Sequence, residues 1–307
     1  MNELVWCVIS DEVRMDAANL PASATIEVGG VTVPRLVYGT AWKEDATERL
    51  VRLAIDQGFR GIDTANQRRH YHEAAVGLAI QRAIADGVVR RDELFLQTKF
   101  TFRRGQDHRL PYDADAPIGE QVAQSLASSL EHLGVDTIDS YVLHGPSRSV
   151  GLAADDWAAW RTMEEIHSSG RVRLLGVSNV SLEQLRLLCA DARVRPSFVQ
   201  NRCYASTGWD RQVRQFCAVE GIVYQGFSLL TANRDVLASE WLGQIARQHG
   251  RTPSQTIFRF ALDVGMIALT GTTSAEHMRE DLAIFDFRLA AEEIAAIESL
   301  ALAGGRA

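Results

Sequence analysis

The sequence predicts a parallel α/β barrel, and three observations carry that prediction. Short runs rich in apolar and β-branched residues recur along the chain, and each is followed by a segment with helical patterning. The runs are apolar throughout instead of alternating with polar residues, which is typical of a parallel sheet buried on both faces. The 307 residues, 46% hydrophobic and 23% charged, have an ordinary globular composition and suit one large barrel, which excludes a disordered or fibrous chain.

A hairpin is the first element that we expect, over Thr25–Val33. Ile26 and Val28 alternate with polar neighbours, and Gly29-Gly30 supplies a two-residue turn with positive φ. Eight strands are expected after it, each closing at a turn. They are Arg35–Gly39, Gly61–Thr64, Leu94–Lys99, Ile138–His144, Arg173–Val177, Ser197–Gln200, Gly221–Gln225 and Met266–Thr270.

Helices are expected between these strands, and four residues are candidate N-caps: Asp45, Ser181, Thr252 and Ser274. Eight strand–helix units in roughly 270 residues favour a closed (β/α)₈ barrel over an open doubly wound sheet. An open nucleotide-binding sheet has a glycine-rich turn after its first strand, whereas this strand ends Tyr38-Gly39-Thr40-Ala41-Trp42. No linker or repeat divides the chain, so we expect one domain over residues 1–307, with residues 1–23 as an N-terminal extension.

Charge and cysteine usage exclude several classes of partner. The 39 acidic residues exceed the 32 basic ones, giving a net charge of −7 with no basic run, so nucleic-acid and anionic-membrane partners are not expected. Residues 1–10 lack the pattern of a signal peptide, and no apolar run reaches the roughly 18 residues of a membrane span. The cysteines lack metal-site spacing, so we expect no metal and reduced thiols in a cytoplasmic protein; they are Cys7, Cys189, Cys203 and Cys217.

Charged residues stand at the ends of three early strands. Asp63, Lys99 and His144 each close a strand, and the chemistry of a barrel gathers at the carboxyl ends of its strands. Each has a simpler explanation alone: a helix cap, a solvated lysine or a hydrogen-bonded core histidine. Because charges are rarely buried without partners, the three together favour a site at the barrel mouth.

An Asp–Lys pair beside a tyrosine has a specific chemical use. A phenol titrates near about 10, and a neighbouring ammonium lowers that pKa. Tyr71 follows the second barrel strand and is the candidate proton donor. Lysine suits this role because its charge can be desolvated, whereas guanidinium holds its proton. Only Lys43 and Lys99 are lysines among the 32 cations, and we expect no role for Lys43.

Several short motifs stand at the strand ends and in the loops that follow them. They are Gly61-Ile62-Asp63-Thr64-Ala65, Tyr71, Glu73, Val76-Gly77, Gln97-Thr98-Lys99, Tyr141-Val142-Leu143-His144, Gly176-Val177-Ser178-Asn179 and Val199-Gln200-Asn201. With these motifs the chain resembles the aldo-keto reductase family from Gly29 to about Leu302. The resemblance implies a barrel whose bottom is closed by the hairpin, and reduction of a small aldehyde or ketone by hydride from a nicotinamide cofactor, without metal.

The same resemblance implies roles for individual residues. Tyr71 would be the general acid, tuned by Lys99 and Asp63, and His144 would orient the carbonyl. Ser178, Asn179 and Gln200 match the residues that bind the carboxamide, Phe227 the ring that stacks on the nicotinamide, and Ser228 a phosphate contact. The other expected cofactor contacts are Gly39, Thr40, Trp42, Asp63, Leu230, Gly271, Thr272, Thr273, Arg279 and Asp281.

Two departures from the family pattern affect these roles. About two extra residues separate Asp63 from Val76-Gly77, so His70 remains an alternative to Tyr71 at the donor position. Many members bind the 2′-phosphate of NADPH through a lysine and an arginine, where this chain has Gly271 and His277. We expect NADPH, with NADH possible, because Arg279 and nearby hydroxyls suit a phosphate whereas Glu280 and Asp281 suit a ribose hydroxyl.

The third departure concerns the roof of the pocket. Many members continue past the last helix into a roofing loop, whereas this sequence reads Gly304-Gly305-Arg306-Ala307 there. The expected substitutes are 101–117 and 1–23, with Trp42 and Trp209 as apolar walls unless they are core residues. His108 and His132 are expected to be solvated. A cofactor-sensing scaffold subunit and a barrel lyase or isomerase are the alternative functions, and the oligomeric state is not predicted.

Overall fold

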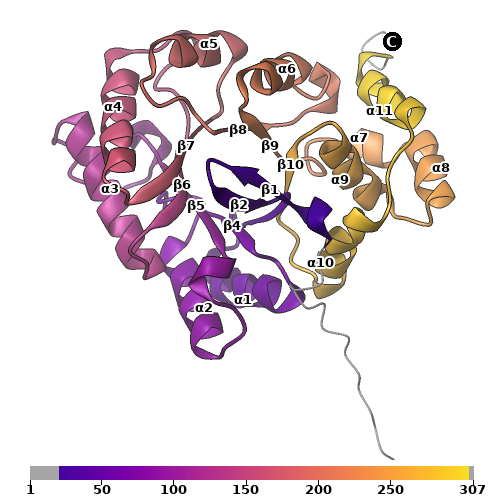
Figure 1. Ribbon diagram of the computed structural model, residues 1–307, viewed down its shortest axis with the longest axis horizontal. Coiled ribbons are helices and arrows are strands. Elements are labelled where there is room, and N and C mark those ends of the chain that lie inside the picture. Colours follow the sequence, from indigo (N-terminus) through magenta and orange to yellow (C-terminus); the bar gives the residue numbers. More distant parts are fainter. Residues whose placement is uncertain (1–20, 304–307) are drawn as a thin grey trace, which may run out of the picture.

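The computed structural model describes residues 21–303, and a closed barrel of eight parallel strands forms its centre (Figure 1). The ring order is β10-β3-β4-β5-β6-β7-β8-β9. The predicted barrel is confirmed, and every strand lies within two residues of its expected range. The strands are β3 (Leu36–Gly39), β4 (Gly61–Asp63), β5 (Phe95–Phe100), β6 (Ile138–Leu143), β7 (Val172–Ser178), β8 (Phe198–Arg202), β9 (Val223–Phe227) and β10 (Ile267–Thr270).

Helices surround the barrel (Figure 1). They are α1 (Thr47–Gln57), α2 (Glu73–Ala85), α3 (Ile118–Leu133), α4 (Ala154–Ser168), α5 (Leu182–Asp191), α6 (Arg211–Glu220), α7 (Arg234–Leu237), α8 (Glu240–Gln248), α9 (Pro253–Asp263), α10 (Ala275–Leu282) and α11 (Ala291–Ala303). None of the helices in the described part of the chain is long and apolar enough to cross a membrane.

Three of the four expected N-caps are confirmed. The hydroxyls of Ser181, Thr252 and Ser274 each accept a backbone N–H three residues further on. Asp45 is not a cap, because it lies inside a short 3₁₀ turn, Glu44–Ala46, that precedes α1. The expected helix therefore begins two residues later than the aspartate.

The hairpin closes the amino-terminal end of the barrel, as expected. It pairs β1 (Thr25–Val28) with β2 (Val31–Pro34), and Gly29 and Gly30 turn between them with φ of 54° and 76°. In Figure 1 it crosses the middle of the ring. Its Val31 and Val33 pack into one apolar cluster with residues of the barrel strands, namely Val37, Phe95, Leu174, Phe198, Ile267 and Leu269.

The next level of the barrel interior is polar. Gln97 Nε2 donates to Gln225 Oε1 at 2.8 Å, and the Ser140 hydroxyl donates to Gln97 Oε1 at 2.8 Å. Gln200 Nε2 also donates to Gln225 Oε1, at 2.9 Å. Since inward side chains alternate along a strand, Phe95, Gln97 and Lys99 of β5 occupy successive levels of the barrel, from apolar base to charged mouth.

Some expectations fall outside the described residues or concern the cysteines. Cys7 and residues 1–20 of the suggested roof lie outside, as do residues 304–307. Cys189, Cys203 and Cys217 are free and buried, as expected of reduced thiols. Burial raises the pKa of all three, to about 11 for Cys189 and about 12 for the other two, so they stay protonated and unreactive at neutral pH.

Candidate functional site

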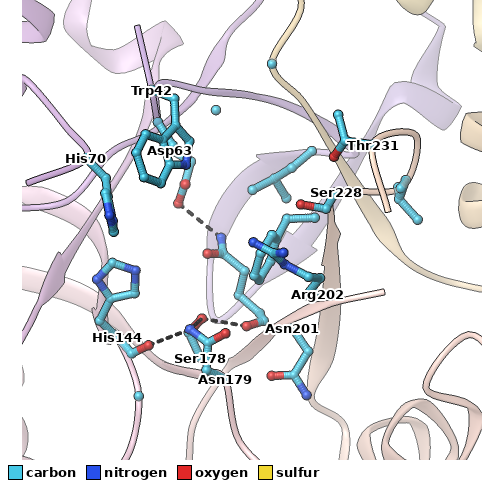
Figure 2. Close-up of a pocket in the computed structure, with 18 of the residues that line it drawn as sticks. Trp42, Asp63, His70, His144, Ser178, Asn179, Asn201, Arg202, Ser228 and Thr231 are labelled. Atoms are coloured by element: carbon cyan, nitrogen blue, oxygen red, sulfur yellow. Dashed lines mark hydrogen bonds between the residues drawn. The ribbon is translucent and has the colours of Figure 1, made fainter. Parts of the chain in front are cut away.

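A cleft of about 1530 Å³ opens where the barrel strands end. Figure 2 shows the residues that converge on it from the strand ends and the loops that follow. It exceeds the roughly 300–1,000 Å³ of usual small-molecule sites, so it has room for two ligands side by side. The predicted residues that line it are Gly39, Trp42, Asp63, His70, Tyr71, His144, Ser178, Asn179, Gln200, Phe227, Ser228, Leu230, Gly271, Thr272, Thr273 and Asp281.

Asp63 and Lys99 form a buried ion pair at the floor of the cleft. Lys99 Nζ donates to Asp63 Oδ1 at 2.5 Å and to the Thr64 carbonyl oxygen at 2.8 Å. The same Oδ1 accepts from the amides of Gln97 and Gln200, at 2.7 and 3.0 Å. Burial lowers the pKa of Lys99, an effect that the Asp63 charge partly offsets. The polar barrel layer thus fixes the carboxylate, and the carboxylate fixes the ammonium.

Tyr71 lies against both Lys99 and His144. Its ring centroid is 5.4 Å from Lys99 Nζ and 5.9 Å from the His144 ring, in an edge-on arrangement. The expected net lowering of the Tyr71 pKa is not found in this structure. Burial, and then the Asp63 charge, raise that pKa well above its usual value, and these effects outweigh the stabilisation that the Lys99 ammonium gives the phenolate.

His70 stands at the mouth, one residue before Tyr71. The amides of His70 and Tyr71 both donate to the Gln67 carbonyl, so the extra residues form a turn that separates the two side chains. The His70 ring stacks on Trp42 with 4.0 Å between ring centroids, and Trp42 is 67% exposed. In Figure 2 the His70 and His144 rings point toward one another across the cleft.

His144 is neutral and oriented by one hydroxyl. Its Nδ1 lies 2.7 Å from Thr101 Oγ1, and burial, followed by the charges of Lys99 and His70, lowers its pKa to about 3. If the Thr101 hydroxyl donates to Nδ1, the ring carries its proton on Nε2. A neutral imidazole with an Nε2–H presents a hydrogen-bond donor to the cleft.

Ser178, Asn179 and Gln200 use their own donors within the protein. Asn179 Nδ2 donates to the His144 carbonyl at 2.8 Å and to Ser178 Oγ at 3.1 Å, and the Ser178 hydroxyl donates to the Gln200 carbonyl at 2.6 Å (Figure 2). Gln200 Nε2 donates to Asp63 and Gln225. In the described part of the chain, Asn179 Oδ1 and Gln200 Oε1 accept no hydrogen bond. These two amide oxygens suit a ligand that donates N–H, such as a carboxamide.

The side of the cleft formed by the loops after β9 and β10 carries hydroxyls and a buried cation, and the Arg202 guanidinium at the end of β8 lies over the Phe227 ring beside them. Ser228 follows β9, and Thr272 and Thr273 follow β10. Lys43 Nζ donates to the Gly271 carbonyl at 2.7 Å, and burial lowers its pKa to about 8. Lys43, for which we expected no role, lines the cleft and is 6% exposed, and no carboxylate of the described residues lies within 4 Å of it.

Backbone strain marks three of the expected cofactor residues. Trp42, Asn179 and Ser228 have φ of 61°, 51° and 56°, in the left-handed region that non-glycine residues rarely adopt. Each lies directly after a barrel strand or in the loop that follows it, and each lines the cleft. Such strain concentrates at binding and catalytic sites, where it aims a side chain at a ligand.

Two of the expected cofactor contacts do not face the cleft. Thr40 is fully buried behind it, and its hydroxyl donates to the Asp63 carbonyl at 3.0 Å. Arg279 is exposed on α10 and donates to Gln57 of α1 at 3.3 Å. Asp281 does line the cleft, where burial raises its pKa to about 7 and Thr270 donates to it.

Two other expectations change in the structure. Trp209 is not a wall of the cleft: it is fully buried and packs on Phe260 with 5.1 Å between ring centroids. His132 is not simply solvated, because its Nδ1 lies 3.1 Å from Oε2 of the buried Glu73. His108 is exposed, as expected.

Comparison with known proteins identifies the family of the chain. The aldo/keto reductase family model matches residues 26–302. This chain belongs to the aldo/keto reductase family. An aldo-keto reductase of Mycolicibacterium vanbaalenii is 32% identical, over 88% of this chain and 88% of that protein. Rabbit (Oryctolagus cuniculus) prostaglandin-E(2) 9-reductase is 28% identical, over 88% of this chain and 89% of that protein.

Solved structures show the same architecture. An aldo-keto reductase of the silkworm, Bombyx mori, superposes with a TM-score of 0.79 at 25% identity, over 92% of this chain and 87% of that one. The complex of that enzyme with NADPH gives a TM-score of 0.78. The chain is thus an NAD(P)H-dependent oxidoreductase that acts on carbonyl groups, and the scaffold, lyase and isomerase alternatives are not favoured.

Several residues of this aldo/keto reductase site escaped the sequence analysis. Gln97 donates to Asp63, and Gln225 accepts from the same Gln97 amide; a signal existed for the role of Gln97, which stands two residues before Lys99 on the same strand face. Arg104 and Arg148 line the cleft from two loops, for which the sequence holds no pattern. No cluster of potential metal ligands occurs among residues 21–303.

Proposed function

We propose that this aldo/keto reductase reduces an aldehyde or ketone to an alcohol with NADPH, and that Tyr71 donates the proton. The observation that carries the assignment is the position of Tyr71 against both Lys99 and His144. His70 is stacked on Trp42 nearer the mouth and fits a role in shaping the entrance.

The residues around the cofactor fit its chemistry. The free oxygens of Asn179 and Gln200 suit the carboxamide, with Ser178 holding Asn179 in place and Phe227 offering a ring for stacking. Lys43 and the hydroxyls of Ser228, Thr272 and Thr273 suit phosphates, since a buried ammonium without a counter-ion favours an anion. The bound cofactor supplies the hydride.

The protein groups then control the proton and the carbonyl. His144 Nε2–H hydrogen-bonds the carbonyl oxygen and places it beside the Tyr71 hydroxyl. The raised pKa of Tyr71 keeps the phenol protonated before the reaction. As the proton leaves, the nearby Lys99 ammonium stabilises the phenolate, and Asp63 keeps that ammonium charged in its buried position.

The test compares Tyr71→Phe with His70→Phe. A general acid contributes on the order of 10²- to 10⁴-fold, so Tyr71→Phe should lower kcat by that factor while His70→Phe changes it by less than about tenfold. Oxidation of NADPH with a panel of simple aldehydes measures kcat, and quenching of protein fluorescence shows whether cofactor still binds. Full activity of Tyr71→Phe would exclude Tyr71 as the donor.

We further propose that the enzyme uses NADPH in preference to NADH. We also propose that it is cytoplasmic, acts on a small molecule, and binds neither nucleic acid nor membranes. Lys43 supports the first, and the silkworm relative was solved with NADPH. Glu280 and Asp281 also line the cleft and favour a ribose hydroxyl, so a lower Kd for NADH would reverse the preference. The net charge of −7 and the free, unreactive thiols support the second.

A further inference from the structure

Two guanidinium groups line the cleft on the side of the barrel that carries Lys99 and His144. Arg104 lies in the loop after β5 and Arg148 in the loop after β6, and both line the cleft. Arg104 Nη2 donates to the carbonyl of Pro146, two residues after His144. The Arg148 carbonyl accepts from Gln184 Nε2 at 2.9 Å, which fixes the backbone that carries this arginine.

Neither arginine has a counter-ion among residues 21–303. Within the described residues, no carboxylate oxygen lies within 4 Å of the Arg104 or Arg148 guanidinium, although both are exposed. Arg109, in the same loop as Arg104, pairs with Asp107. A charge without a partner in a concave site attracts an anionic ligand.

The acidic residues that line the cleft are engaged or remote. Asp63 is held by Lys99, and Asp210 accepts from Asn201 Nδ2 and the Tyr224 hydroxyl, both at 2.9 Å. The remaining two, Glu280 and Asp281, lie on α10, after β10. The loops that carry Arg104 and Arg148 contribute no acidic side chain to the lining.

The ring order separates these arginines from the groups that suit phosphates. In the sequence β10-β3-β4-β5-β6-β7-β8-β9, β5 stands opposite β9, and β6 stands opposite β10. Ser228 follows β9, and Thr272 and Thr273 follow β10. Arg104 and Arg148 therefore lie across the barrel, in the loops that follow the strands of Lys99 and His144.

We propose that the carbonyl substrate carries a carboxylate beyond its reacting carbonyl, and that Arg148 and Arg104 bind this carboxylate. The inference rests on the proposed function, because it takes His144 as the carbonyl ligand. Guanidinium is planar and matches a carboxylate with two parallel hydrogen bonds, which neither Thr101 nor His144 offers. The exposed Trp42 ring supplies an apolar surface for the body of such a substrate.

The experiment compares two aldehydes of the same shape, 4-formylbenzoate and the neutral 4-formylbenzamide. Wild type should have the higher kcat/KM for the carboxylate, through a lower KM that rises with salt. Arg148→Gln and Arg104→Gln should each lower the ratio of the two kcat/KM values about tenfold or more, as expected for a charge-assisted hydrogen bond. Arg186→Gln, which removes an exposed guanidinium on α5 outside the cleft, should leave the ratio unchanged.

Binding without turnover separates this inference from the proposed function. Line broadening of 4-formylbenzoate in NMR spectra should weaken in Arg148→Gln and Arg104→Gln but not in Arg186→Gln. Equal kcat/KM for both aldehydes in wild type, with no effect of either cleft variant, would overturn the carboxylate proposal and leave the reductase intact. Arginine-dependent binding without oxidation of bound NADPH would instead contradict the reductase mechanism.

Discussion

The two halves of the cleft satisfy their polar groups in different ways. On the β4–β6 side, Asp63 and Lys99 are buried and bonded to each other, and His144 is held by Thr101. On the β9–β10 side, Ser228 is half-buried and Thr273 is exposed. In the first half the charged groups are paired within the protein, whereas in the second the hydroxyls of Ser228 and Thr273 make no hydrogen bond to the described residues and are left to a ligand.

This difference predicts where substitutions act. Removing one member of a buried pair leaves an uncompensated charge, so variants on the β4–β6 side should affect catalysis and stability together. Variants on the β9–β10 side lose contacts that exist only with ligand bound, so they should affect Kd and little else.

Lys99→Met should give the largest effect. Loss of the ammonium removes the group that stabilises the phenolate of Tyr71, so kcat should fall by about 10³-fold or more. The buried Asp63 carboxylate is left unpaired, so the free energy of unfolding should fall by about 3–5 kcal/mol. Single-turnover kinetics and urea unfolding measure the two effects.

The control for Lys99→Met is the Kd of NADPH, which should stay within a few-fold of wild type because no phosphate-side contact changes. Retained turnover in a folded Lys99→Met protein would refute the role of the lysine. Lost turnover with an unchanged free energy of unfolding would mean that the pair is not charged in the folded protein.

Thr101→Val should give the next largest effect. Without the hydroxyl, His144 Nδ1 loses its partner and the ring no longer favours the proton on Nε2. A buried polar group left without its hydrogen bond costs on the order of 1–3 kcal/mol, so kcat should fall about 10- to 100-fold.

Thr101→Ser, which keeps the hydroxyl, should retain most of the activity and serves as the matched control. Because the pKa of His144 is about 3, neither protein should show a titration of this histidine between about pH 5 and pH 8. Equal kcat for the Val and Ser variants would show that Thr101 does not set the tautomer.

The sequence predicts the buried half of the site better than the open half. Asp63, Lys99 and His144 stand at strand ends, and strands run straight from an apolar base to the mouth, so their convergence follows from strand order. Gln97 obeys the same alternation. Charged and amide groups inside a barrel need partners, and the partners come from neighbouring strands.

The positions of the other site residues depend on loop conformation and on the rotation of a helix about its axis, which the sequence does not predict. Lys43 reaches Gly271 because the chain turns at Trp42 and Glu44, both with positive φ. No local sequence pattern predicts these two backbone conformations. Arg279 points away because Met278 and Asp281 form the buried face of α10. The pKa of Tyr71 depends on how deeply the fold buries the phenol and on its distance from Asp63, neither of which follows from sequence spacing.

Lys43→Met should give the smallest effect on kcat and should act on cofactor binding alone. Lys43 is the one strongly buried cation among the groups proposed for phosphate, and a charge-assisted hydrogen bond contributes roughly 1.5–3 kcal/mol, so the Kd of NADPH should rise about tenfold or more while kcat changes little. Lys43→Arg keeps the charge and should lose less affinity. An effect of Lys43→Met on kcat as large as that of Thr101→Val would contradict the division between the two halves.

The pH dependence of cofactor binding sharpens this prediction. The pKa of Lys43 is about 8 in the free protein, so the ammonium is mostly charged below pH 8 and mostly neutral above it. Only the charged form attracts a phosphate, so binding above pH 8 requires uptake of a proton and the Kd should rise with pH between about 8 and 10. Lys43→Met lacks the titrating group and should show a flat Kd over that range, as measured by fluorescence quenching. Parallel pH profiles for wild type and Lys43→Met would show that this ammonium does not meet the cofactor.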